Sequence, residues 1–174
     1  MQDPGDSTEV AISWKQNVLV VAQQTASSPE LLSALTVRAE RTPTTVHLIV
    51  PAPPLGGERE TAARTLDLAL AKFRTAGLDA DGAVGNPDPF VAVTDAWDPR
   101  TYDEIVVSTL PIGTSKWLHA GLPERIERVT GAVVTHVVSA RPSPEPATRP
   151  SPAGQRRSGL GPLSVLGWGR AMGP

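Results

Sequence analysis

The sequence of 174 residues contains no cysteine, which excludes disulfides, thiol catalysis and cysteine-based zinc sites. It has no run approaching the roughly 20 apolar residues of a membrane-spanning helix. Its first 16 residues are acidic and polar and lack the apolar core of a secretory signal. We therefore expect a cytoplasmic protein with no membrane partner.

Aromatic residues make up only 4% of the chain, and basic residues are not interleaved with them. Residues 141–174 hold five arginines and one glutamate, a balance of +4, so the net charge of −2 leaves −6 for residues 1–140. An acidic domain with few aromatics does not favour nucleic acid as a partner. The basic tail has the composition of a solvated segment, although it could also contact acidic partners or its own domain.

The sequence contains no recognisable catalytic constellation. Its three histidines are scattered without metal-ligand spacing: His47, His119 and His136. Asp95 and Asp98 near a predicted helix end are typical of solvated or capping carboxylates, and no Gly-x-Ser-x-Gly elbow is present. We therefore expect a protein that is not an enzyme.

Short apolar runs alternate with helical patterns along the chain. The predicted strands cover 17–22, 44–50, 78–85, 102–109 and 132–140. The predicted helices cover 27–40, 58–77, a segment opened by Pro87, and 122–131. This alternation predicts an α/β fold with a five-stranded parallel, doubly wound, Rossmann-like sheet.

Local signals define several ends and faces of these helices. Ser27 with Glu30 forms a capping box, Asn86 precedes Pro87 as a cap, and Gly77 is placed to end the second helix. The second helix carries the clearest apolar face: Ala62, Leu66, Ala69, Leu70 and Phe73.

Three regions follow from this pattern: a polar N-terminal extension over 1–15, the α/β domain over 16–140, and a tail rich in proline, glycine and arginine over 141–174. The tail regains apolar residues near its end: Leu160, Leu163, Val165, Leu166 and Trp168. We hypothesise that this patch docks on its own domain or on a partner protein. One function open to the chain is therefore that of an interaction or scaffold protein that works through its tail.

The order of elements, the "GNPDP" turn from Gly85, the strand "YDEIVVST" from Tyr102 and the final strand "AVVTHVV" carry a family resemblance. Over about residues 16–140 the chain resembles the universal stress protein family, as an actinobacterial-type member with a degenerate nucleotide loop. The resemblance implies an adenine nucleotide α-hydrolase-like fold and, as ligand, ATP or AMP if the chain binds one at all.

ATP-binding members of that family carry Gly-x-x-Gly, nine residues and then Gly-Ser or Gly-Thr. In this register the positions are held by Ser108, Pro111, Gly121 and Leu122, and the usual aspartate after the first strand is Gln23. The candidate ligand-binding residues are Gln23, Val50, Ser108, Gly113, Thr114, Ser115, Lys116 and Gly121.

These departures weaken a phosphate loop in physical terms. Pro111 has no amide hydrogen, and Leu122 lacks a hydroxyl that could reach phosphate. Thr114, Ser115 and Lys116 offer partial replacements for an anion. Alternatively, Lys116 is solvated, and the two hydroxyls cap a short turn that begins at Trp117.

The resemblance implies a regulatory or stress-response module that acts by association, with a homodimer formed through the fifth strand, Ala132 to Ala140. That strand is a natural sheet edge, which needs to be paired or covered. A weaker alternative is an enzyme of the nucleotide α-hydrolase class that binds adenosine in the same crevice.

Overall fold

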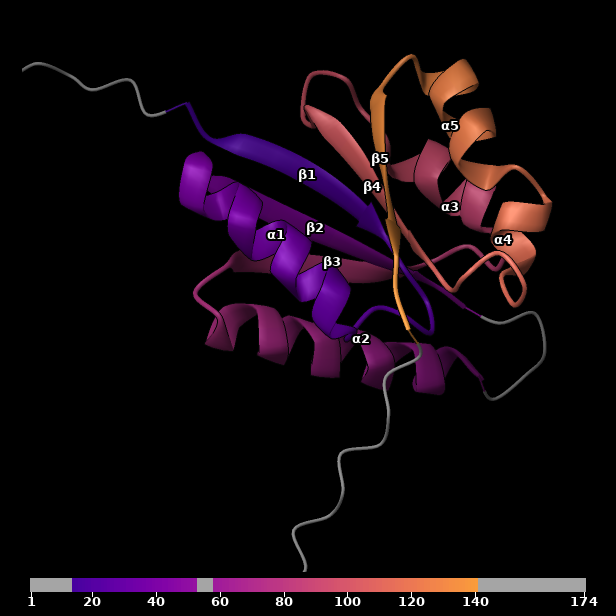
Figure 1. Ribbon diagram of the computed structural model, residues 1–174, viewed down its shortest axis with the longest axis horizontal. Coiled ribbons are helices and arrows are strands. Elements are labelled where there is room, and N and C mark those ends of the chain that lie inside the picture. Colours follow the sequence, from indigo (N-terminus) through magenta and orange to yellow (C-terminus); the bar gives the residue numbers. More distant parts are fainter. Residues whose placement is uncertain (1–13, 53–57, 141–174) are drawn as a thin grey trace, which may run out of the picture. The chain divides into compact units, whose positions relative to one another are not determined.

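The computed structural model describes residues 14–52 and 58–140, which form one parallel sheet between two layers of helices (Figure 1). The strands are β1 (Gln16–Val21), β2 (Thr44–Pro51), β3 (Asp79–Gly85), β4 (Glu104–Thr109) and β5 (Val133–Val138). The helices are α1 (Pro29–Arg41), α2 (Glu58–Thr75), α3 (Pro89–Ala96), α4 (Lys116–His119) and α5 (Leu122–Thr130). Helices α1 and α2 cover one face of the sheet, and α3, α4 and α5 lie over the other.

The strands lie in the order β3-β2-β1-β4-β5, and every pairing is parallel. This order confirms the predicted five-stranded parallel α/β fold. Strands β1 and β4 occupy the middle, where Val20 pairs with Leu48 on one side and with Val106 on the other. Being buried on both faces explains why these strands read as continuous apolar runs.

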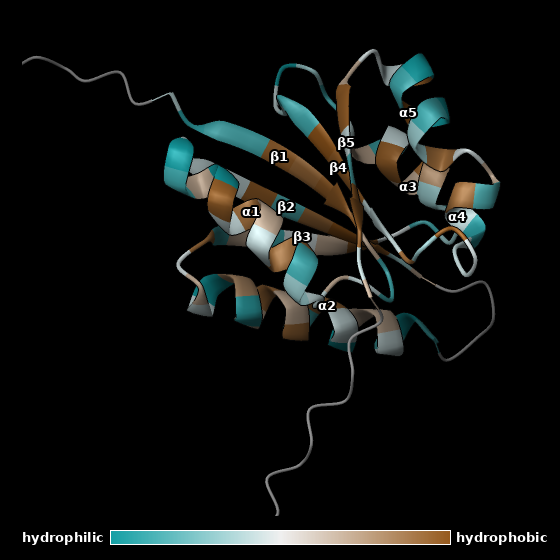
Figure 2. Ribbon diagram, viewed as in Figure 1, coloured by the Kyte–Doolittle hydropathy of each residue, from teal (hydrophilic) through white to brown (hydrophobic). Residues whose placement is uncertain are grey.

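Alternate residues of the strands supply two separate cores. Val18 and Val20 pack toward α1 and α2, whereas Leu19 and Val21 pack toward α3 and α5. Figure 2 shows the hydrophobic colouring concentrated on the central strands. All five predicted core residues of α2 are buried, with Phe73 fully so, which confirms the apolar face read from their spacing.

Two predicted helix starts are wrong by one or two residues. Helix α1 is capped by Ser28, whose Oγ accepts from the Leu31 amide at 3.2 Å, and not by Ser27. Helix α3 begins at Pro89 with Asp88 as its cap, two residues beyond the predicted start at Pro87. The reason is a preceding turn in which Asn86 Oδ1 accepts from the Asp88 amide at 3.0 Å, so Asn86 caps a turn instead of the helix.

The predicted end of α2 at Gly77 is confirmed, and α5 ends at a glycine in the same left-handed conformation. Gly77 follows α2 with φ 84°, and Gly131 follows α5 with φ 65°. Both values lie where residues with a Cβ are strained, so glycine at these positions lets the chain turn back into the next strand.

A buried carboxylate joins four elements at the amino ends of the central strands. Glu104, only 6% exposed, opens β4 and accepts hydrogen bonds from Arg38 of α1 at 2.6 Å and from Thr135 of β5 at 2.5 Å. The side-chain amide of Gln16 in β1 lies 3.4 Å from its second oxygen. This network holds α1 and the edge strand β5 to the centre of the sheet.

No helix within residues 14–52 and 58–140 has the length and apolar character needed to cross a membrane. The predicted tail over 141–174, including its apolar patch, lies outside the described residues, as do residues 1–13 of the predicted N-terminal extension.

We expect Arg38→Ala to lower the free energy of unfolding by about 3 kcal/mol, because it leaves the buried charge of Glu104 without its partner. Adding Glu104→Gln should recover part of this loss, since the unpaired charge is then gone. Urea denaturation followed by circular dichroism measures both effects. The control is Arg64→Ala, which breaks the exposed Arg64–Glu60 pair of α2 and should cost less than about 1 kcal/mol. Equal losses for Arg38 and Arg64 would contradict the structural role of the network.

Candidate functional site

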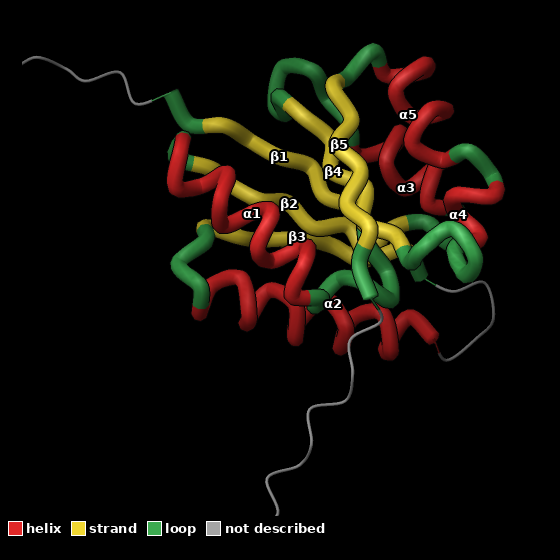
Figure 3. The backbone as a smooth tube through the Cα atoms, in the orientation of Figure 1, coloured by secondary structure: helices red, strands yellow, loops and turns green. Residues whose placement is uncertain are grey.

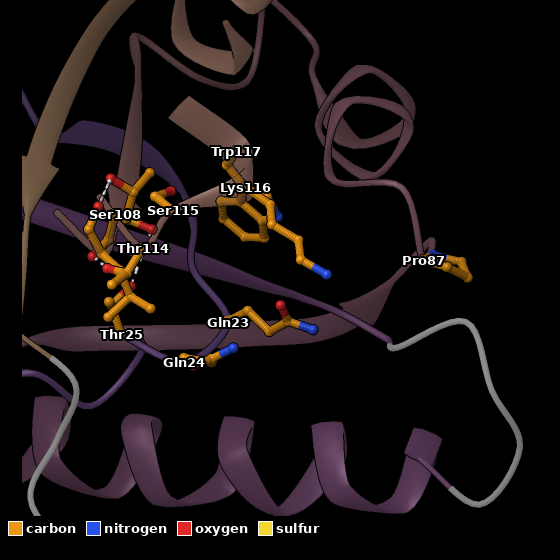
Figure 4. A pocket seen from close by; sticks show the side chains of 11 residues that line it. Gln23, Gln24, Thr25, Pro87, Ser108, Thr114, Ser115, Lys116 and Trp117 are labelled. Atoms are coloured by element: carbon orange, nitrogen blue, oxygen red, sulfur yellow. Dashed lines mark hydrogen bonds between the residues drawn. The ribbon is translucent and has the colours of Figure 1, made fainter. Parts of the chain in front are cut away.

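A crevice of about 480 Å³ opens at the carboxyl ends of β1 and β4. This is the point where the strand order reverses, with β2 on one side of β1 and β4 on the other, and ligands of open α/β sheets bind at such a point. Figure 3 shows loops gathered at this edge of the sheet. The crevice is lined by Gln23, Gln24, Thr25, Pro87, Ser108, Thr109, Leu110, Thr114, Ser115, Lys116 and Trp117 (Figure 4).

Two residues that line the crevice, Thr25 and Ser108, belong to a buried cluster of three hydroxyls. Ser108 Oγ donates to Thr25 Oγ1 at 2.8 Å, and Thr25 Oγ1 in turn donates to the Ser108 carbonyl at 3.0 Å. Ser139 Oγ lies 3.1 Å from Ser108 Oγ and donates to it, since the Ser108 proton is already committed. All three residues are at most 2% exposed. The hydroxyl of Ser108 therefore bonds to the protein itself and not to the space where a ligand would lie.

The loop that follows β4 is closed on itself by one carbonyl. The Pro111 oxygen accepts the amide of Thr114 at 2.8 Å, the amide of Ser115 at 3.0 Å and the Thr114 hydroxyl at 3.1 Å. A phosphate cradle requires such donors to face the ligand. In this loop the donors of Thr114 and Ser115 form the hydrogen bonds of a turn. Most of the polar cluster predicted to bind an anion in place of glycines is therefore not free to do so.

Ser115 has the capping role that the sequence left open. Its Oγ accepts from the Leu118 amide at 3.3 Å and caps α4, which begins at Lys116, one residue before the predicted start. Thr114 does not cap the helix, because its hydroxyl bonds to Pro111.

Lys116 supplies positive charge to the crevice. Its side chain extends into the open part of the crevice on the side where Gln23 lies, with the Trp117 ring beside it (Figure 4). Lys116 forms no ion pair with any residue in the described ranges. No acidic side chain is found among the described residues that line the crevice. The site can thus interact with an anion of low charge through the Lys116 ammonium and the side-chain amides of Gln23 and Gln24.

Five of the eight predicted ligand-binding residues line the crevice: Gln23, Ser108, Thr114, Ser115 and Lys116. Val50 is buried in the core under α1 and α2, Gly113 is exposed in the loop, and Gly121 stands before α5 with φ 60°. These three residues do not line the crevice. The side chain of Val50 faces the core, and α4 lies between the loop and Gly121. The assignment of a ligand to the set stays a prediction.

Sequence reasoning did not single out several lining residues: Gln24, Thr25, Pro87, Thr109, Leu110 and Trp117. Gln24 and Thr25 directly follow the predicted first strand, so their position after a central parallel strand was an available signal. Pro87 comes from the turn before α3 and reaches the crevice only through the fold.

Two histidines are engaged in hydrogen bonds within the sheet. His136 Nε2 lies 2.7 Å from Thr109 Oγ1, and Thr109 donates its own proton to the Leu110 carbonyl at 3.0 Å, so the imidazole is the donor. His47 of β2 contacts Asp81 of β3 at 2.5 Å. His119 lies exposed at the end of α4. Within the described residues, no group of His, Asp or Glu side chains is arranged to hold a metal ion.

The strand order, the helices on both faces and the crevice at the switch point define an open, parallel α/β fold. Within that class the fold is that of the universal stress proteins. A universal stress protein from Archaeoglobus fulgidus in complex with dAMP superimposes with a TM-score of 0.54 at 15% identity, covering 72% of this chain and 99% of that one.

A second structure of a universal stress protein from Archaeoglobus fulgidus has a TM-score of 0.54 at 16% identity, over 70% of this chain and 93% of that one. A universal stress protein family protein from Arabidopsis thaliana with AMP bound has a TM-score of 0.50 at 14% identity, over 72% and 92%. No protein-family model and no curated protein matches the sequence. The likeness therefore shows the fold.

We expect Ser108→Ala to destabilise the protein by about 1–3 kcal/mol, because it removes the centre of the hydroxyl cluster and leaves buried polar partners unsatisfied. Thr114→Ala is the matched control, since its hydroxyl is exposed and should contribute within about 0.5 kcal/mol. Urea unfolding curves of both variants provide the comparison. A Ser108 variant as stable as the control would show that the hydroxyl cluster does not stabilise the protein.

Proposed function

We propose that this chain is a member of the universal stress protein family that serves as a regulatory or stress-response module. It acts by binding a small adenine nucleotide and a second copy of itself, without catalysis. The observation that carries this proposal is the crevice at the junction of β1 and β4, which is lined by neutral amides and hydroxyls with the ammonium of Lys116. Its position is that of a nucleotide site in an open α/β sheet.

The charge and donors of the crevice favour one phosphate over three. A triphosphate needs several amide donors and cations, but the amides of Thr114 and Ser115 bond to Pro111, and proline itself offers no amide hydrogen. Each missing donor to a charged phosphate costs about 1.5–3 kcal/mol, so two missing donors weaken a triphosphate by roughly two to four orders of magnitude. Of the two nucleotides that the resemblance implies, AMP therefore fits better than ATP. Two structures of this fold contain monophosphates, dAMP and AMP.

Hydrogen bonding in the crevice argues for binding without turnover. The hydroxyls of Ser108 and Thr25 donate within the hydroxyl cluster, and neither contacts a base. Thr109 does contact His136, but its hydroxyl donates to the Leu110 carbonyl and the residue is only 2% exposed. A nucleophile needs an accessible oxygen whose proton is taken by a neighbouring base. None of these hydroxyls meets both conditions.

The edge strand β5 supports the proposal of a homodimer. Val133 is 66% exposed and Val138 is 50% exposed, and both apolar side chains lie in the strand at the edge of the sheet. An unpaired edge of this kind is a template for another strand, and pairing with a second copy would cover it.

We expect AMP to bind the purified full chain in isothermal titration calorimetry, with ATP binding no more tightly. Lys116→Ala should weaken AMP by about tenfold, because it removes the charge that faces the phosphate. Lys15→Ala is the control, since Lys15 pairs with Asp79 and does not line the crevice. The absence of binding at millimolar AMP would rule out the nucleotide function, and a Lys116 variant with unchanged affinity would place the phosphate elsewhere.

Val133→Lys combined with Val138→Lys should convert a dimer into a monomer, because the two charges would be forced into the pairing edge. Light scattering coupled to gel filtration measures the mass of each species. Leu68→Lys is the control, as Leu68 is 64% exposed on α2 and distant from the edge in sequence and element. A wild-type chain that remains monomeric at high concentration would refute the dimer.

A further inference from the structure

A second cavity of about 430 Å³ adjoins the crevice. It lies between the turn before α3 and the pair formed by α4 and α5. Trp117 and Pro87 line both cavities, so the two spaces share these two walls. Each volume by itself falls in the range of small-molecule sites, roughly 300–1,000 Å³. A nucleoside monophosphate in the crevice would leave the second cavity unfilled.

The second cavity has the chemistry of a site for a planar group that is linked to an anion. Its walls include the apolar side chain of Leu122, and Arg125 lines it with a guanidinium that stacks on the Phe90 ring at 4.4 Å. That contact holds the guanidinium in place, and Arg125 makes no ion pair with any residue of the described ranges. The one carboxylate of the lining, Asp88, caps α3 by accepting from the Phe90 amide at 2.8 Å.

Lys116 and Arg125 thus present one cation to each cavity, with Trp117 in the wall of both. Two cations match the two charges of a diphosphate better than the four of a nucleoside triphosphate. An indole is a stacking surface for a planar base, and a guanidinium can stack on a base and bond to phosphate.

From this arrangement we propose that the two cavities form one site for a dinucleotide, in which a diphosphate joins two nucleosides. The first nucleoside and its phosphate occupy the crevice near Lys116. The second phosphate and its nucleoside enter the adjoining cavity, where the phosphate faces Arg125 and the base packs against Trp117. The proposal rests on the proposed nucleotide function and extends it, since it assigns a role to a cavity that a mononucleotide does not reach.

Calorimetric titration of the full chain with AMP and with diadenosine diphosphate tests this inference. The dinucleotide should bind about tenfold more tightly than AMP, because it adds the contacts of Trp117 and Arg125. Arg125→Ala should abolish that gain and leave the affinity for AMP unchanged. Arg128→Ala, an exposed arginine on the same helix that lines neither cavity, should change neither affinity.

Arg125 also covers Phe90, so Arg125→Gln provides a second variant that keeps the side-chain stem and removes the charge. It should likewise lose most of the gain for the dinucleotide. Equal wild-type affinities for the two ligands would overturn the inference, as would an Arg125 variant that weakens both ligands equally. If AMP fails to bind but the dinucleotide binds through Arg125, the two-cavity site stands and the AMP function falls. If neither ligand binds, both proposals fail.

Discussion

The parallel pairing of β1 with β4 is the contact on which the rest of the structure depends. Both strands are buried on both faces, and their register sets Val18 beside Glu104 at one end and Val21 beside Val107 near the other. At the amino end, this alignment delivers Glu104 to its bonds with α1 and β5. At the carboxyl end, it brings Thr25 and Ser108, which are 83 residues apart in sequence, into hydrogen-bonding contact. One pairing therefore produces both the stabilising network and the crevice.

The crevice lies at the switch point of the sheet, and several of the hydrogen-bond donors around it bond to the protein itself. The buried hydroxyl cluster and the turn closed by the Pro111 carbonyl each satisfy polar groups that would otherwise need a ligand or water. These internal hydrogen bonds stabilise the protein without a ligand, because burying polar groups that lack partners costs free energy. They also restrict the ligands that can bind, since a highly charged phosphate chain finds few free donors.

The crevice, the second cavity and the edge strand β5 are linked by contacts at the carboxyl ends of the strands. The crevice and the second cavity share Trp117 in their walls, and Thr109 in the crevice wall bonds to His136 on the edge strand β5. A ligand that shifted Thr109 would therefore act on the strand through which we propose dimerisation. The parallel sheet places these features together because all carboxyl ends of parallel strands point the same way.

By itself the sequence determined the number and kind of strands, the buried face of α2 and the glycine helix ends, because each depends on local periodicity or on the chemistry of one residue. The loss of an amide at Pro111 is also a covalent fact that needs no structure. Only the tertiary structure decided where loop side chains point. Val50 enters the core because contacts across the fold outweigh small local preferences. Thr114 bonds to Pro111 and α3 begins at Pro89 because short-range hydrogen bonds compete with the predicted caps. Likewise, Trp117 and Arg125 line the same cavity only because α4 and α5 pack beside the turn before α3.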